Sequence, residues 1–210
     1  MSLPCGGAWR RLCVAAAALV ASAVAGCPGY ADVANLTNAD LAGFRLSSFA
    51  GTWYEIQSHN LPIITTGCRC TRYDVGVTAG GWGTRFLCRR GDNVVELHSD
   101  NRNASDPTYP GKLTESWRFR SFHLPATDYW VLDVRTDGRG GYRHALVYSC
   151  TRVLGFKQEW LYIFARETSV PAADLAAWKG YLRAKGVDAS KLAPVPQGDG
   201  CWPSADGLVM

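Results

Sequence analysis

The stretch Gly51-Thr52-Trp53-Tyr54-Glu55-Ile56 decides how the rest of the chain is interpreted. Aromatic and β-branched residues favour extended backbone, so we predict a strand over residues 51–59. Similar runs follow, separated by turns rich in glycine, proline and aspartate. They predict further strands at 69–77, 83–90, 93–99, 112–121, 128–135, 142–150 and 158–166. Eight short strands joined mostly by tight turns predict an all-β, up-and-down antiparallel barrel, because closure removes exposed sheet edges.

One helix is predicted after the strands. Leu175, Trp178 and Leu182 recur at helical spacing and form an apolar stripe on one face. Pro171 suits a first helical turn and Gly186 suits a helix end. We therefore expect a single C-terminal α-helix packed against the outside of the barrel, followed by an extended tail.

Composition limits the kinds of protein that this chain can be. It has 210 residues, of which 47% are apolar and 19% charged, as in a globular protein. Lys and Arg number 22 against 18 Asp and Glu, and only Arg10 and Arg11 of these charges lie in residues 1–25. The remainder is therefore close to neutral, which argues against nucleic acid as a partner. No apolar run reaches the roughly 18 residues of a membrane-spanning helix.

The first 25 residues have the pattern of a secretory signal. Arg10 and Arg11 precede the apolar stretch 12–25, which ends in the small residues Ala23-Val24-Ala25. We therefore predict a signal peptide over 1–25, a single domain over 26–210 and a secreted protein. An alternative is a lipobox at 24–27, in which Cys27 would carry a lipid anchor. The sequons that begin at Asn35 and Asn103 are candidate glycosylation sites in a eukaryotic secretory route.

In this setting the first strand resembles the opening of a lipocalin, whose Gly-x-Trp signature matches Gly51 and Trp53. Residues 144–150 and 161–166 are similar to the seventh and eighth strands of apolipoprotein D-like lipocalins. The resemblance implies that Arg166 covers the Trp53 ring at the closed end of the barrel, where cation–π attraction stabilises the floor. One departure is the turn 136–142, which is glycine-rich and lacks the first tyrosine of the family's second motif.

Six cysteines follow the signal segment: Cys27, Cys68, Cys70, Cys88, Cys150 and Cys201. In an oxidising compartment we expect all six to form disulfides, although their spacing alone leaves the pairing open. The resemblance to apolipoprotein D-like lipocalins implies Cys27–Cys150 and Cys68–Cys201, which leaves Cys70 with Cys88. The additional cysteines resemble those of plant chloroplastic lipocalins and keep a plastid or thylakoid-lumen location open. A zinc site with His98 is the alternative, and we predict no metal.

Strand alternation indicates which side chains face the barrel interior. The predicted ligand-binding residues are Tyr73, Trp117, Phe119, Tyr129 and Tyr162. Glu55 shares the face of Trp53, so we expect a buried acid with a raised pKa. The loop at 57–67 is apolar for a loop, which suits contact with a ligand, a membrane surface or the barrel rim.

The resemblance implies that the barrel binds and transports or sequesters a small hydrophobic molecule: a fatty acid, sterol, retinoid, carotenoid or bilin. No catalytic motif is present, so we predict neither an enzyme nor a cofactor. Two alternatives remain open at this point. One is an enzyme that modifies a lipid or carotenoid in the same cavity, and the other is a lipid-anchored envelope or stress lipocalin.

Overall fold

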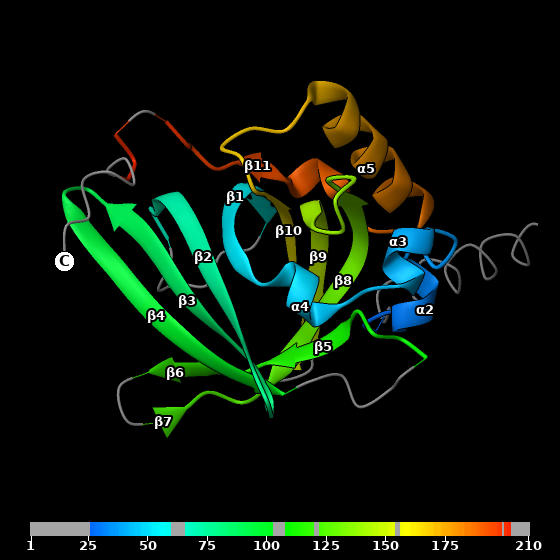
Figure 1. Cartoon of the computed structure of the whole chain (residues 1–210), viewed down its shortest axis with the longest axis horizontal. Helices are drawn as coiled ribbons and strands as arrows, with labels where there is room; N and C mark the ends of the chain where they lie inside the picture. The colour runs from blue at the N-terminus through cyan, green and yellow to red at the C-terminus, as the bar shows by residue number, and fades with distance from the viewer. Residues whose placement is uncertain are drawn as a thin grey trace, which may run out of the picture.

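The computed structural model describes residues 26–59, 66–102, 108–119, 122–153, 156–198 and 200–202. Three short helices lead into a curled antiparallel sheet, and a longer helix and a tail follow it (Figure 1). The helices are α2 (Tyr30–Val33), α3 (Ala39–Ala42), α4 (Leu46–Phe49) and α5 (Ala172–Ala184), with a 3-10 turn at Ala189–Lys191. The strands are β1 (Gly51–His59), β2 (Arg69–Thr78), β3 (Gly81–Arg90), β4 (Asn93–Arg102), β5 (Lys112–Glu115), β6 (Trp117–Phe119), β7 (Phe122–His123), β8 (Thr127–Thr136), β9 (Tyr142–Val153), β10 (Phe156–Ala165) and β11 (Ala193–Pro194).

The strand order confirms the predicted all-β architecture. The sheet runs β5-β8-β9-β10-β1-β2-β3-β4-β6-β7, and every pairing that we describe is antiparallel. Its two ends belong to one continuous stretch of chain, because β5 pairs with β8 while β6 pairs with β4. The sheet therefore curls back on itself through residues 112–119.

The fifth predicted strand, 112–121, is interrupted at Ser116 and divides into β5 and β6. Together with the short strands β7 and β11, this break explains why the structure has more strands than predicted. The Ser116 amide donates to the side-chain Oδ1 of Asn101 (2.7 Å), and its hydroxyl donates to the carbonyl of Leu124 (2.8 Å). These bonds take Ser116 out of the regular ladder. The chain bends there and moves from the edge of β8 to the edge of β4.

Helix α5 lies outside the sheet, as predicted. The Trp178 indole donates to the buried carboxylate of Asp133 on β8 (2.7 Å), and Leu182 is fully buried. Gly186 ends this segment with a φ of +73°, a conformation that glycine adopts without strain, and the amide of Val187 bonds the carbonyl of Leu182. Within the described residues, no helix is long and apolar enough to span a membrane.

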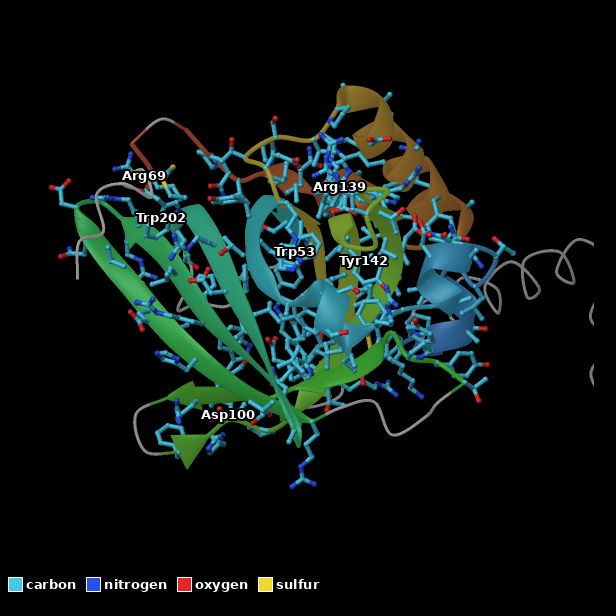
Figure 2. The ribbon with its side chains drawn as sticks, in the orientation of Figure 1. Trp53, Arg69, Asp100, Arg139, Tyr142 and Trp202 are labelled. Carbon is cyan, nitrogen blue, oxygen red and sulfur yellow. A yellow bond between two sulfur atoms is a disulfide. The ribbon has the colours of Figure 1, made fainter. Side chains whose placement is uncertain are left out.

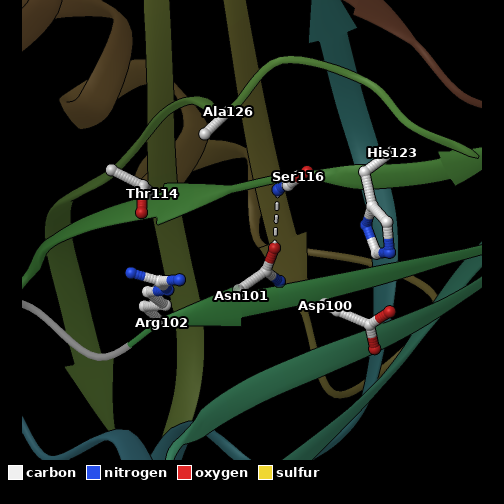
Figure 3. A pocket seen from close by; sticks show the side chains of 7 residues that line it. All are labelled: Asp100, Asn101, Arg102, Thr114, Ser116, His123 and Ala126. Carbon is white, nitrogen blue, oxygen red and sulfur yellow. Dashed lines mark hydrogen bonds between the residues drawn. The ribbon is translucent and has the colours of Figure 1, made fainter.

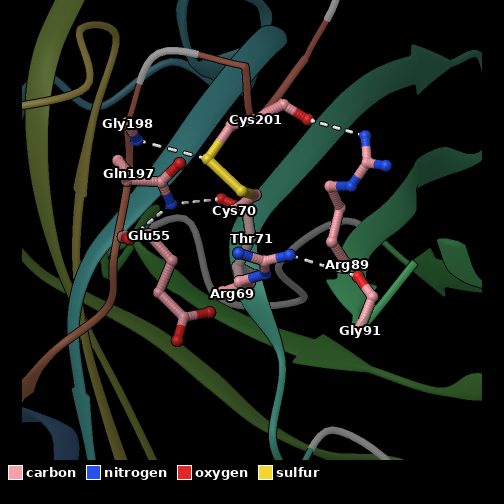
Figure 4. Close-up of a disulfide and its surroundings, with 9 residues drawn as sticks. All are labelled: Glu55, Arg69, Cys70, Thr71, Arg89, Gly91, Gln197, Gly198 and Cys201. Carbon is pink, nitrogen blue, oxygen red and sulfur yellow. Dashed lines mark hydrogen bonds between the residues drawn. A yellow bond between two sulfur atoms is a disulfide. The ribbon is translucent and has the colours of Figure 1, made fainter. Parts of the chain in front are cut away.

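The C-terminal tail fills a gap between β1 and β2. These two strands pair only over Gly51–Tyr54 and Arg72–Val75, and β11 pairs with Gln57 and Ser58 farther along β1. The Gln197 side chain then donates to the carbonyls of Glu55 and Thr71, both at 2.9 Å (Figure 4). The tail thus bridges the two strands where their own pairing has ended.

Three disulfides hold these segments, and their pairing corrects part of our prediction. Cys27 joins Cys150, as the resemblance implies. The other partners are exchanged: Cys68 joins Cys88, and Cys70 joins Cys201. The cause is a register shift between Arg69 and Arg72, where Cys70 has a φ of +58° and its amide bonds the carbonyl of Pro196 in the tail. Cys70 therefore sits against the tail, and Cys68 is left to reach Cys88.

This pairing also bears on three of the alternatives. All six cysteines in the described part of the chain are bonded, so none is free for zinc or for a cysteine-based enzyme. No cluster of three potential metal ligands occurs among the described residues. The Cys27 sulfur is occupied by Cys150, whereas a lipid anchor at a lipobox cysteine requires that sulfur.

Candidate functional site: the barrel interior

The floor of the interior is built around Trp53 on β1. Its indole donates to the carbonyl of Phe49 (2.7 Å), and the two rings lie 4.8 Å apart. The Arg166 guanidinium lies 3.8 Å from the Trp53 ring, which is the arrangement that the resemblance implies. Figure 2 shows Trp53 among the strands, with Tyr142 on the side of β8 and β9. The closed end is therefore filled by packed aromatic rings.

Aromatic side chains also meet across the interior beside this floor. Tyr129 on β8 lies 4.9 Å from Trp82 on β3, although β3 and β8 are not neighbours in the sheet. Tyr73 on β2 contacts Phe164 on β10 in the same way, at 4.9 Å across β1. Contacts between strands that do not pair require side chains that point inward, which places Tyr73 and Tyr129 in the interior.

The other predicted lining residues follow the same pattern as far as they are described. Tyr162 stacks on Phe164 at 5.6 Å, and Trp117 lies 6.1 Å from Phe86. Both Tyr162 and Trp117 are only partly buried, in contrast to the floor residues. The side chain of Phe119 lies outside the described part of the chain. Four of the five predicted lining residues are therefore brought together, and their role in binding a ligand remains a prediction.

Glu55 is the buried acid expected from the strand pattern. It is fully buried, and its Oε2 accepts a hydrogen bond from the Tyr73 hydroxyl (2.9 Å). Burial raises its pKa to about 7, and hydrogen bonds from Ser58 and Tyr73 counteract only part of that effect. At neutral pH this carboxyl is therefore protonated in a large fraction of the molecules.

A second buried acid, Glu115 on β5, was missed in the sequence. It is 8% exposed, and burial raises its pKa to about 8. Ser99 donates to its Oε1 at 3.4 Å, and Asn101 donates to Ser99 at 2.8 Å. The signal was available, because Glu115 has the same strand parity as Trp117. Trp82 and Phe86 were missed for a similar reason, since alternation on β3 was not followed.

Open hollows lie on the outside of the sheet. One of about 510 Å³ sits where β4 meets the bend at Ser116 and is lined by Asp100, Asn101, Arg102, Thr114, Ser116, His123 and Ala126 (Figure 3). Asn101 connects this hollow to Glu115 through Ser99. A second hollow of about 590 Å³ lies at the closed end beside Arg139 and Arg166. Both are open and lined mainly by residues with polar side chains, unlike the aromatic interior.

Two further predictions concern the surface. The side-chain amide of Asn35 donates to Asp133 at 3.3 Å and accepts from the Thr37 hydroxyl at 2.9 Å. Asn103 lies outside the described residues, as do residues 60–65, the main part of the predicted membrane-contact loop, and the signal segment 1–25. Glycosylation, membrane contact and the signal peptide therefore stay predictions.

Comparison with known proteins agrees with this architecture. A family model described as a lipocalin-like domain matches residues 44–197. Apolipoprotein D of Macaca fascicularis is 26% identical over 157 residues, which cover 73% of this chain and 77% of that protein. Mouse (Mus musculus) apolipoprotein D is 25% identical over 158 residues, with the same coverage of both chains.

Two solved structures show the same fold. Lobster apocrustacyanin A1 has a TM-score of 0.62 at 19% identity, covering 85% of this chain and 92% of its own. Insecticyanin from the tobacco hornworm Manduca sexta also has a TM-score of 0.62, at 21% identity, covering 77% of this chain and 85% of its own.

Proposed function

Because this chain belongs to the lipocalin-like family, we propose that its barrel binds one small, mainly apolar molecule and transports or sequesters it. The observation that carries the proposal is the set of aromatic contacts that cross the interior beside the Trp53 floor. Side chains of this kind make up the walls of small-molecule sites, where a few polar groups fix the orientation of the ligand. Here the tyrosine hydroxyls and two carboxyls supply those polar groups.

We propose a secreted location for this carrier. Three disulfides fit an oxidising compartment and also fasten the ends of the domain to the barrel. A plastid or thylakoid-lumen location would be equally oxidising. Expression with the natural N-terminus and sequencing of the mature end separate these cases, because secretion predicts cleavage after Ala25 and release into the medium.

The proposed function is tested by titrating the purified protein with retinoids, fatty acids, sterols, carotenoids and bilins while recording tryptophan fluorescence. We expect saturable quenching by at least one class, because Trp82 and Trp117 lie in the interior. Tyr162→Ala should weaken that binding about tenfold, which is the effect of losing one large apolar contact. Val77→Ala is the matched control, since Val77 is exposed and lies near the closed end.

Two results would contradict the proposal. One is the absence of saturable binding by every class in the panel. The other is an equal effect of Tyr162→Ala and Val77→Ala, which would place the bound molecule outside the barrel.

A further inference from the structure

Two buried carboxyl groups belong to the interior of the barrel. Glu55 comes from β1 and Glu115 from β5, and both are buried. Burial and the negative charge of each acid raise the pKa of the same three interior hydroxyls, those of Tyr73, Tyr129 and Tyr162.

Side-chain contacts link the two acids: Tyr73 donates to Glu55, its ring packs against Phe86, and Phe86 packs against Trp117. Trp117 is two residues from Glu115 and has the same strand parity, so both acids face the same interior.

The described residues supply these two carboxyl groups with few hydrogen-bond donors. Glu55 Oε1 is buried and has no hydrogen-bond partner among the described residues. For Glu115, the Ser99 contact is long, at 3.4 Å. The groups that shift the pKa of either carboxyl are hydroxyls and an indole, and they include no lysine, arginine or histidine of the described chain.

We propose that the preferred occupant is a hydrophobic cation, an apolar molecule whose protonated amine lies between Glu55 and Glu115. This inference rests on the proposed function and specifies the chemistry of the ligand. A buried carboxylate is stabilised by an opposite charge that also donates hydrogen bonds, and nothing on the described walls provides one. An anionic ligand such as an ionised fatty acid would instead add a third negative group to the same space.

The binding of a cation must then depend on pH. Burial raises the pKa values of Glu55 and Glu115 to about 7 and about 8, so both are largely protonated at pH 6. The facing hydroxyls of Tyr73, Tyr129 and Tyr162 have pKa values raised well above their usual range and stay neutral. An alkyl amine with a pKa of about 10 keeps its proton in this range, so its affinity increases as the carboxyls ionise.

The test compares n-decylamine, n-decanol and n-decanoate, which share one chain and differ in the head group. Binding is followed by tryptophan fluorescence from pH 6 to pH 9, below the aggregation limit of each probe. We expect decylamine to bind at least about tenfold more tightly than decanol at pH 8.5, the size of effect that a charge-assisted hydrogen bond supplies. This preference should decrease toward pH 6, and decanoate should bind most weakly at pH 8.5.

Two variants locate the effect. Glu55→Gln with Glu115→Gln should bring decylamine and decanol to within about twofold of each other, while binding of decanol persists and shows that the barrel is folded. Glu96→Gln is the control, because Glu96 is an exposed carboxylate on the outer face of β4, paired with Arg85.

The outcomes separate this inference from the proposed function. If decanol binds as well as decylamine, if decanoate binds more tightly, or if the preference survives in the double variant, the inference is wrong and the carrier function stands. If none of the three probes binds while a member of the wider panel does, the inference is also wrong. If no ligand of the wider panel binds, both this inference and the proposed carrier function are wrong.

Discussion

The Arg166 guanidinium covers the Trp53 ring and also donates hydrogen bonds to backbone carbonyls. It therefore holds the floor of the barrel to the chain segment just before β1. The shortest of these bonds, both at 2.7 Å, reach Thr52 and Ala50. Further bonds reach Ser48, Phe49 and Tyr142. Burial lowers the pKa of Arg166 to about 10, so the group keeps its charge at neutral pH. One side chain thus joins α4, β1 and β9.

Arg166→Met should lower the free energy of unfolding by about 2–4 kcal/mol, because several carbonyls lose a charged donor while the aliphatic packing is largely kept. Urea unfolding followed by tryptophan fluorescence measures the change. Arg143→Met is the control. Arg143 is exposed and paired with Glu167, so its loss should cost less than about 1 kcal/mol. Equal losses in the two variants would show that Arg166 has no special role.

Gly51 is required by the same arrangement. Its φ is +101°, and a Cβ atom at this position would lie 3.1 Å from Nη1 of Arg166. Gly51→Ala should therefore destabilise the protein by about 1–3 kcal/mol, through backbone strain and displacement of the guanidinium. Gly76→Ala on β2 is the control, since a Cβ there meets nothing within 4 Å. Thermal unfolding of both variants measures the difference, and an unchanged melting temperature for Gly51→Ala would contradict the expectation.

The two interior acids predict how stability changes with pH in the absence of ligand. The folded-state pKa values of Glu55 and Glu115, about 7 and about 8, exceed the ordinary value of 4.5. The folded protein therefore binds more protons than the unfolded chain between these values, so stability decreases as pH rises through them. We expect this contribution, on the order of a few kcal/mol, to be complete below about pH 4.5 and lost by about pH 8.5.

The measurement is the free energy of unfolding at pH 5, 7 and 8.5, for the natural sequence and for Glu55→Gln with Glu115→Gln. Burial lowers the pKa of His144, which produces an opposite slope near pH 6 in both proteins. The difference between the two profiles removes that shared contribution. A difference that does not change with pH would show that neither carboxyl is buried in its protonated form.

The strands and the outer helix were predictable because their signals are local, whereas the floor followed from the family resemblance. Aromatic runs, turn residues and the stripe containing Trp178 and Leu182 are read within short windows of sequence. The break at Ser116 was not predictable, because it depends on Asn101, a residue of another strand. The lining residues followed from alternation, and Glu115 would have followed too had its parity with Trp117 been used.

The exchange of disulfide partners has a similar origin. Regular pairing about the turn at Ala79-Gly80 would place Cys70 and Cys88 nearly opposite each other, but Arg72 pairs with Leu87 and the register shifts beyond it. Neither the shift nor the tail that lies against Cys70 has a local signal. The disulfide pairing could therefore be assigned only from the three-dimensional structure.

The disulfide pairing can be checked directly, because Arg69 separates Cys68 from Cys70 and provides a tryptic cleavage site between them. Trypsin digestion of the denatured, unreduced protein should release the peptide Cys70-Thr71-Arg72 bonded to the C-terminal peptide that contains Cys201. The peptide Phe86-Leu87-Cys88-Arg89 should be bonded to the peptide that ends at Arg69. Mass spectrometry before and after reduction identifies both pairs. A species that joins the 70–72 and 86–89 peptides would instead support the pairing that the family resemblance implies.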